Sequence, residues 1–422
     1  MNGQRVLSIL SKPTLSMTGG ATAGTENSPS SYRYAVLLIG FVTLAGCSIL
    51  SGCFGVFYQT LVEAFAWKRA SGASPYAVNM LVSILSAPAL GWLLDRYGPR
   101  WVFTGAALLS GSALIACSTL QTLGHFVLYY GVLNALGQTA LGSVAVVIAR
   151  WFAPPRRGRA IALADVGTGL GMVLGIPGTA WLISTCGWRQ AFVILGSVIM
   201  VLLVPLNLWQ RPPPPSAEPA ARRGRLGGIW YSRPFWMLCL AHGCMTVTMT
   251  MVNVHLVPFL VSSGRLELLG AASIASAVSL VSLGGRVCFG WLVDRLHGEG
   301  AFSLAMSCTI TGYAMLLILS QASAAWPLSA FVLLYGFAQG AGGIAIAAKT
   351  AALFHGPALG TIFMLVNLSG NLGAALGAWC GWRLFDLSAS YTLTFTTAMV
   401  SGILAISCMW LGRQPEPLTQ EA

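Results

Sequence analysis

Apolar segments of about 20 residues recur along the whole of this 422-residue chain, and each is long enough to cross a bilayer as a helix. Only 8% of the residues are charged, whereas a soluble domain carries roughly 25%. So few charges cannot cover a water-facing surface, which predicts an all-α polytopic membrane protein. The segments predict twelve transmembrane helices, at 34–58, 74–94, 101–121, 125–149, 159–184, 190–209, 234–261, 269–293, 301–321, 326–350, 358–382 and 389–411.

Three short sequences occur twice in the same order, about 200 residues apart. The clearest is Gly-Trp-Leu-Leu-Asp-Arg at 91–96, which returns as Gly-Trp-Leu-Val-Asp-Arg at 290–295. The other pairs are 126–131 with 331–336, and 163–171 with 365–373. This repetition predicts two pseudo-symmetric six-helix bundles in tandem. Repeated bundles of apolar helices suggest a transporter, whose site lies between the halves.

The polar and proline-rich segments predict the domain boundaries. We expect an N-terminal extension at 1–32, the first bundle at 33–209 and the second bundle at 234–411. The linker at 210–233 contains four consecutive prolines and several arginines, a composition that interrupts helices. A short tail at 412–422 ends the chain.

The net charge of +12 raises the question of nucleic-acid binding, but the arginines lie in loops between spans. With the N-terminus in the cytoplasm, 16 of the 23 Lys and Arg residues fall in cytoplasmic segments and 5 in outer loops. This asymmetry predicts that both termini are cytoplasmic. We expect a multi-pass monomer in the cell membrane, a bacterial inner membrane, with the lipid bilayer rather than nucleic acid as its partner.

Neither the cysteines nor the glycines predict a metal or a cofactor. The ten cysteines stand singly, mostly inside apolar runs, which argues against a disulfide framework or a metal cluster. The glycine-rich segments at 167–171 and 340–343 lack the strand and the Gly-Lys-Ser of a phosphate loop. We therefore expect no cofactor. The sequence also contains no cluster of His, Glu and Asp residues that would suggest an enzyme.

The segment 91–100, with Gly91, Asp95, Arg96 and Arg100, resembles the signature loop of the major facilitator superfamily. The copy at 290–295 stands where that superfamily repeats the loop. The resemblance covers about residues 33–411 and implies a secondary active transporter that works by alternating access.

Finer features resemble the branch of the monocarboxylate porters and the oxalate/formate exchangers. They lie at 54–69, 150–160, 187–192 and 285–295. Two residues depart from the pattern of this branch. Asn367 lies where the oxalate exchangers carry a lysine, and Ser282 replaces an aspartate that is usual in the porters. The resemblance thus implies a small organic anion, a monocarboxylate in particular, and makes a dicarboxylate less suitable.

Charged residues inside spans are the strongest candidates for a binding site, because a charge at mid-membrane costs roughly 2.5–3.5 kcal/mol. Arg286 precedes Arg295 by nine residues, which places it ~13 Å deep in the membrane. A guanidinium binds a carboxylate with two parallel hydrogen bonds, so Arg286 is the predicted anion-binding residue. The alternative is a structural ion pair.

Asp165 lies ~9 Å deep by the same helical rise and matches Asn367 in the internal repeat. We predict proton coupling by Asp165, or else a fixed structural pair. Spans five and eight meet between the halves in the superfamily that the chain resembles, so the resemblance implies an ion pair of Asp165 with Arg286 when the site is empty. The predicted substrate contacts are Arg286, Asn367, Tyr58, Gln59, Gln138, His255, Gln339 and Lys349. For His255 a hydrogen-bonded helix residue is the alternative, and for Lys349 a side chain that reaches the interface.

The repeated loops predict gates rather than binding groups. A carboxylate just past one helix can face the positive N-terminal end of another, which explains the repeated Gly and Asp better than membrane anchoring alone. The predicted gating residues are Gly91, Asp95, Arg96, Arg100, Gly290, Asp294 and Arg295.

The function expected from these patterns is transport of a small organic anion by proton symport or by exchange for a counter-anion. Another cargo, such as an aromatic compound, a siderophore or a drug, is the alternative. A membrane enzyme and a non-transporting sensor fit less well, since the chain has neither a catalytic cluster nor a long signalling tail.

Overall fold

The computed structural model describes residues 30–67, 72, 74–211, 226–262, 266–321, 326–354, 357–388 and 390–413. Nine helical stretches in these ranges are long and apolar enough to cross a membrane. The elements are α1 (Ser30–Phe65), α3 (Ser74–Cys117), α4 (Leu123–Phe126), η1 (Val127–Asn134), α5 (Ala135–Leu141), α6 (Val144–Trp151), α7 (Pro154–Leu208), α8 (Leu226–Ile229), α9 (Arg233–Ser262), α10 (Leu268–Gln321), α11 (Trp326–Ala338), α12 (Ala341–Leu353), α13 (Leu359–Ser388) and α14 (Tyr391–Leu411).

Three of the stretches are too long for a single crossing. Helices α3, α7 and α10 contain 44, 55 and 54 residues, whereas about 20 residues cross a bilayer. Each has one non-helical residue, at Gly98, Gly187 and His297, with φ of 77°, 79° and 58°. These breaks lie between the predicted spans, so dividing the three helices there gives the twelve predicted spans.

The two breaks in the repeated loops correspond to each other. His297 stands at the same distance from Asp294 as Gly98 does from Asp95. Glycine adopts a positive φ without a steric penalty, and histidine is among the few other residues enriched there. The sharp turn after the motif is therefore kept in both halves, with a different residue.

Two of the predicted spans are interrupted within the membrane. The predicted span 125–149 consists of α4, a π-helix (η1), α5 and α6, and α5 ends before Gly142. The predicted span 326–350 consists of α11 and α12, and Gly340 at φ 88° separates them. Irregular backbone at membrane depth is tolerated where it is buried in protein or lines a cavity.

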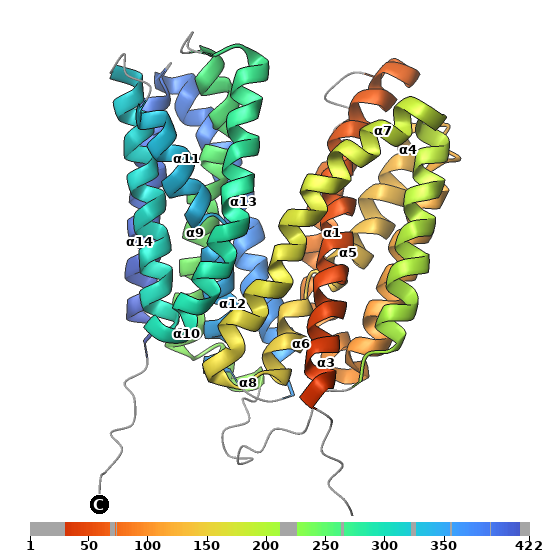
Figure 1. Ribbon diagram of the computed structural model, residues 1–422, viewed down its shortest axis with the longest axis horizontal. Helices are drawn as coiled ribbons and strands as arrows, with labels where there is room; N and C mark the ends of the chain where they lie inside the picture. Colours follow the sequence, from red (N-terminus) through yellow and green to blue (C-terminus); the bar gives the residue numbers. More distant parts are fainter. Residues whose placement is uncertain are drawn as a thin grey trace, which may run out of the picture.

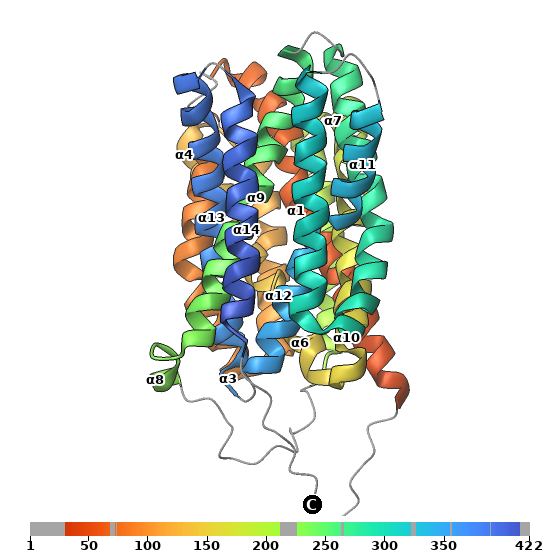
Figure 2. The same ribbon diagram turned by 90° about the vertical axis from the view of Figure 1, so that its left-hand side faces the viewer.

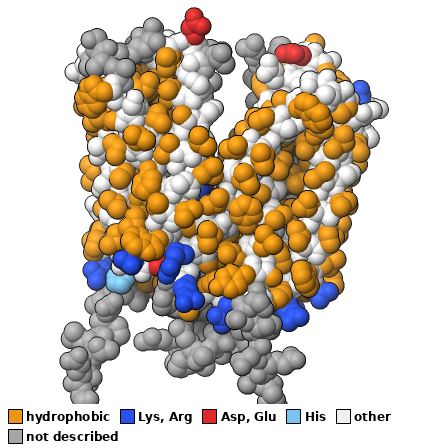
Figure 3. All heavy atoms as spheres, in the orientation of Figure 1, with side chains coloured by type: hydrophobic (Ala, Val, Ile, Leu, Met, Phe, Trp, Pro, Cys, Tyr) orange, Lys and Arg blue, Asp and Glu red, His pale blue; other side chains and the backbone are white. Residues whose placement is uncertain are grey.

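The helices form two bundles that meet at one end. Helices α1 to α7 form one and α9 to α14 the other (Figure 1), and a view turned by 90° shows the long helices running the height of the molecule (Figure 2). A cleft opens between the bundles at the top, and Lys and Arg side chains gather at the bottom (Figure 3). We call this closed face the arginine-rich end.

The boundaries of the predicted extension, linker and tail remain predictions, because residues 1–29, 212–225 and 414–422 lie outside the described residues.

Glycines spaced four apart hold helices together in both bundles. On α7, a Cβ at Gly167 or Gly171 would collide with the backbone of Phe41 or Ala45 on α1. On α13, Gly373 and Gly377 meet the backbone of α9 at Gly243 and Val247 in the same way. Small residues let helix backbones approach closely in lipid, and Gly171 and Gly373 are equivalent positions of the internal repeat.

Gly171→Leu should therefore destabilise the first bundle, by about 1–3 kcal/mol for an overpacked contact. Gly178→Leu on the same helix is the matched control, because a Cβ there meets nothing within 4 Å. Thermal unfolding of the purified proteins in detergent should show a lower Tm for Gly171→Leu only. Equal Tm values for the two variants would contradict the packing role of the glycine.

Candidate functional site

A cavity of about 270 Å³ lies between the two bundles. Its walls come from both halves of the chain, as the internal repeat predicts for a transporter. Asp165 on α7 and Arg286 on α10 are the charged residues in its wall, Asn367 on α13 adds a polar side chain, and Gly340 lies beside the guanidinium. The remaining wall is apolar or glycine: Leu44, Gly142, Ala145, Ile148, Ile161, Ala164, Gly343, Ile344, Ala347 and Phe363.

Asp165 and Arg286 form the ion pair that the sequence predicts. Arg286 Nη1 donates to the carboxylate of Asp165 and, at 3.4 Å, to its backbone carbonyl. The hydroxyl of Thr168 donates to the other carboxylate oxygen at 3.1 Å. The side chains are only 13% and 26% exposed for Arg286 and Asp165, so each offsets the cost of burying the other.

The guanidinium of Arg286 keeps a hydrogen-bonding capacity that this pair does not use. Its Nε is buried and has no hydrogen-bond partner among the described residues. Gly340 makes room for the group, because a Cβ there would lie 2.8 Å from Cζ and 3.0 Å from both Nε and Nη2. An arginine offers two edges for bidentate binding, and Asp165 engages only the Nη1 side.

A second cavity of about 330 Å³ adjoins the first, since both have Gly142 and Asn367 in their walls. Gln138 also lines it and donates a hydrogen bond to Ser51. Of the predicted substrate contacts, Arg286, Asn367 and Gln138 thus lie in the space between the bundles. Sequence reasoning missed His242, which lines the second cavity and whose Nδ1 contacts the carbonyl oxygen of Val366 at 3.0 Å.

The other predicted contacts lie elsewhere. Tyr58 stacks on Phe54, and Gln59 is exposed. Gln339 lies near the hydroxyl of Tyr335. None of these three is among the residues that line the two central cavities.

Lys349 and His255 also lie outside those two walls. Lys349 on α12 forms an ion pair with Glu299 on α10 inside the second bundle, a partner that sequence reasoning did not identify. His255 is fully buried on α9, with its ring 5.8 Å from that of Tyr391. Lys349 thus takes an ion-pair partner on a neighbouring helix rather than reaching the interface, and substrate contact by either residue stays a prediction.

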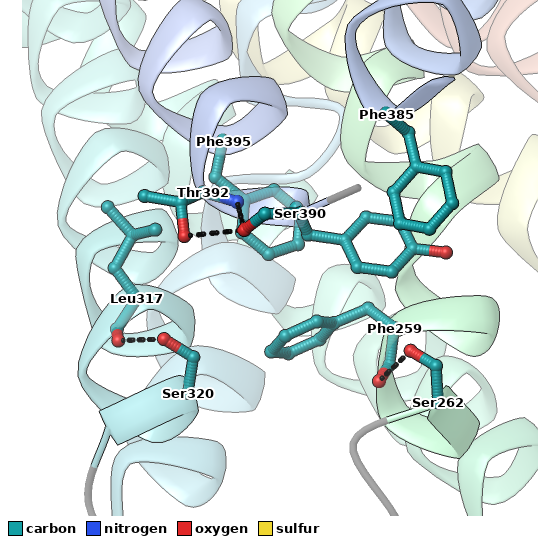
Figure 4. Close-up of a pocket in the computed structure, with 9 residues that line it drawn as sticks. Phe259, Ser262, Leu317, Ser320, Phe385, Ser390, Thr392 and Phe395 are labelled. Carbon is teal, nitrogen blue, oxygen red and sulfur yellow. Dashed lines mark hydrogen bonds between the residues drawn. The ribbon is translucent and has the colours of Figure 1, made fainter. Parts of the chain in front are cut away.

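A third cavity, of about 280 Å³, lies in the second bundle where α9, α10, α13 and α14 end or begin (Figure 4). Aromatic rings such as Phe259 and Phe385 face a space bordered by the hydroxyls of Ser262, Ser320 and Ser390 (Figure 4). None of the nine residues drawn there is charged. An anion would find no countercharge in this wall, in contrast to the cavity at Arg286.

At the arginine-rich end, Asp95 forms one of the contacts that hold the two bundles together. Its carboxylate accepts hydrogen bonds from the backbone N–H of Gly360 at 2.8 Å and of Thr361 at 2.7 Å, at the start of α13. Arg150, which sequence reasoning missed, donates to the same carboxylate at 2.7 Å. A Cβ at Gly91 would lie 2.8 Å from the backbone of Gly360 and Thr361, so only glycine permits this approach.

Asp294 repeats the arrangement in the other direction. It accepts from the backbone N–H of Gly158 at 2.6 Å and of Arg159 at 3.1 Å, near the start of α7. Gly290 lies against the same segment, where a Cβ would come within 3.2 Å of the carbonyl of Gly158. Asp95 therefore caps the N-terminus of α13, and Asp294 binds α7 near its beginning, where the helix dipole also favours negative charge.

The arginines of the motif do not pair with these carboxylates. Arg96 lies 5.1 Å from the ring centre of Trp92, Arg100 5.2 Å from that of Trp101, and Arg295 4.2 Å from that of Trp291. Such cation–π contacts contribute about 0.5–1 kcal/mol at exposed sites.

Asp95→Asn and Asp294→Asn should loosen the two capped helix ends, since a hydrogen bond to a charged group contributes about 1.5–3 kcal/mol. We expect amide hydrogen exchange to rise roughly tenfold or more, at residues 358–364 in Asp95→Asn and at 156–161 in Asp294→Asn. Asp386→Asn, an exposed aspartate near the other end of α13, is the control. Exchange like that of the wild type in both motif variants would exclude a closing role for the carboxylates.

Comparisons with known proteins find membrane transporters that are similar to this chain. Monocarboxylate transporter 13 of Rattus norvegicus is 27% identical over 94% of this chain and 95% of its own length. Monocarboxylate transporter 11 of Homo sapiens is 26% identical over 81% and 75%. The crystal structure of the E. coli fucose:proton symporter superimposes with a TM-score of 0.75 at 13% identity, over 91% of this chain and 99% of that one.

The family model of the major facilitator superfamily matches residues 32–378, which is most of the chain. The relatives confirm the resemblance to the monocarboxylate branch, and the shared architecture confirms the predicted fold class. The chain belongs to the major facilitator superfamily and is a multi-pass membrane transporter rather than an enzyme.

Proposed function

We propose that this transporter moves a small organic anion, a monocarboxylate, by alternating access, coupled to a proton or to a counter-anion. The observation that carries the proposal is the position of Arg286, a largely buried guanidinium in the wall of the cavity between the bundles. Relatives named as monocarboxylate transporters support the same class of cargo.

The size and charge of the central space suit a small anion. The cavity at Arg286 measures about 270 Å³, below the usual range of roughly 300–1,000 Å³ for drug-sized ligands. Its wall contains one positive and one negative side chain, Arg286 and Asp165. A single carboxylate that binds Arg286 would add one negative charge to a nearly neutral site, whereas a dianion would add two.

Asp165 provides the coupling in this proposal. A carboxylate cargo has to approach a guanidinium that Asp165 already holds, and two like charges on one arginine repel each other. Protonation of Asp165 removes that repulsion and so favours anion binding, which links a proton and the cargo in one transport step. The unused Nε of Arg286 gives the cargo a donor while Thr168 keeps Asp165 in place.

In this proposal, the carboxylates of Asp95 and Asp294 control the change between the outward-open and inward-open states. In the structure the bundles are closed at the arginine-rich end and separated at the other (Figure 3). If that end is cytoplasmic, as the arginine distribution favours, the structure corresponds to an outward-open state. Release of Asp95 from α13 and of Asp294 from α7 would then open the cytoplasmic side.

A neutral cargo, such as an aromatic compound, is the alternative, and it would leave the charge of Arg286 unused. Arg286→Glu with retained transport would favour it.

Arg286→Ala should abolish uptake, because truncating one partner of a buried charge pair costs about 2–5 kcal/mol. Arg286→Lys keeps the charge and should retain part of the uptake. Arg189→Ala is a matched control, since Arg189 is exposed and lies over the ring of Trp188. Uptake of radiolabelled monocarboxylates into proteoliposomes with equal amounts of inserted protein tests this. Normal uptake by Arg286→Ala would overturn the assignment.

Asp165→Asn imitates the protonated carboxyl group, so it should bind the anion with little dependence on pH. The variant should lose accumulation driven by a pH gradient and keep exchange of cargo across the membrane. Accumulation and counterflow in the same proteoliposomes separate these two activities. If the variant still accumulates cargo with the pH dependence of the wild type, Asp165 is a structural residue.

A further inference from the structure

A groove of about 510 Å³ runs along the first bundle, away from the space between the bundles. It lies between one face of α5 and the two segments of α3, which we call its arms, on either side of Gly98. On α5 it is lined by Leu136, Gly137 and Ala140, whereas Gln138 and Gly142 line the central cavities. On α3 its lining includes Ser86, Leu90, Leu93, Tyr97, Trp101 and Gly105.

The groove faces the membrane. Tyr97 and Trp101 in its wall are 52% and 62% exposed, and a Cβ at Gly105 would meet nothing within 4 Å. A surface of this kind is covered by lipid in a protein that spans a bilayer. Its length along α3, from Ser86 to Tyr97, is ~16 Å by the helical rise, close to half of a ~30 Å hydrocarbon core. The groove therefore matches the depth of one leaflet.

Two arginines stand at the end of the groove. Arg96 lies 5.7 Å from the ring centre of Tyr97, and Arg100 lies 5.2 Å from that of Trp101. Both arginines are exposed, and the described ion pairs of the chain include neither. Two guanidinium groups thus adjoin an apolar channel at the level where a lipid headgroup begins.

We propose that this groove is a binding site for an anionic phospholipid. One acyl chain lies along Leu90 and Leu93 towards Ser86, and the headgroup phosphate binds Arg96 and Arg100. Charge complementarity selects an anionic headgroup over a zwitterionic one, because basic residues near a membrane surface attract anionic lipids.

The groove lies on the side of α3 opposite the contact with α13 that closes the arginine-rich end. On the same arm of α3, Gly91 and Asp95 face the start of α13, whereas Leu90 and Leu93 line the groove. A lipid held there would press this arm towards α13 and favour the state that is closed at the arginine-rich end.

The test uses the full chain in vesicles with a photoreactive acyl chain on either phosphatidylglycerol or phosphatidylcholine. We expect the phosphatidylglycerol probe to label peptides that contain 86–109 and 136–140, and the phosphatidylcholine probe to label them much less. In Arg96→Gln/Arg100→Gln the preference should fall by roughly fivefold for each arginine lost. Equal labelling by the two probes in the wild type would overturn the proposed headgroup recognition.

Gly105→Leu fills the groove while leaving both arginines in place, so labelling by both probes should fall. Gly178→Leu, also in open space but on α7, should be labelled like the wild type, which controls for folding. Labelling of Gly105→Leu at the wild-type level would show that the acyl chain lies elsewhere. Cross-links between two copies of the chain through 86–109 instead of lipid labelling would identify a dimer interface and overturn the proposal.

Discussion

A partly buried ion pair between the two halves of the molecule is the constraint on which the rest depends. Arg286 belongs to one bundle and Asp165 to the other, and each makes the burial of its partner tolerable. The pair joins the bundles, and in the proposed mechanism it also carries the charge that an anion recognises and the group that a proton neutralises. In that proposal, binding, coupling and the contact between the halves cannot change independently of one another.

The surrounding packing permits movement around this pair. Glycines bring α7 against α1 and α13 against α9 at backbone distance, because small residues let helices approach closely in lipid. Between the bundles, the arginine-rich end is held by carboxylates on helix N-termini. Apolar side chains of both bundles, such as Leu94 and Phe363, also belong to one buried cluster, so opening has to separate polar and apolar contacts together while each bundle keeps its own packing.

Much of the fold could be predicted because the bilayer imposes simple requirements on sequence. Long apolar runs identified the spans, and the duplicated 91–96 and 290–295 segments identified the two halves. The repeat also related Asp165 to Asn367, and both line the cavity beside Arg286. These inferences succeeded because depth in a membrane follows directly from position along a helix.

Other features depend on the rotation of each helix and on partners distant in sequence, which spacing alone does not give. Lys349 was a candidate substrate contact, yet it pairs with Glu299. Arg150, the partner of Asp95, and His242, in the wall of the second cavity, were not singled out. The role of Gly340 also appears only in three dimensions, where its missing side chain leaves space for the guanidinium of Arg286.

The central claim is that a carboxylate is recognised by a buried guanidinium between the bundles. Counterflow in proteoliposomes tests it most directly when a series of radiolabelled monocarboxylates is compared with the neutral amides of the same acids. The account predicts counterflow of one or more carboxylates and none of the matching amides, at every pH at which the acids are ionised. Equal counterflow of an acid and its amide would contradict it, because the negative charge would then contribute nothing to recognition.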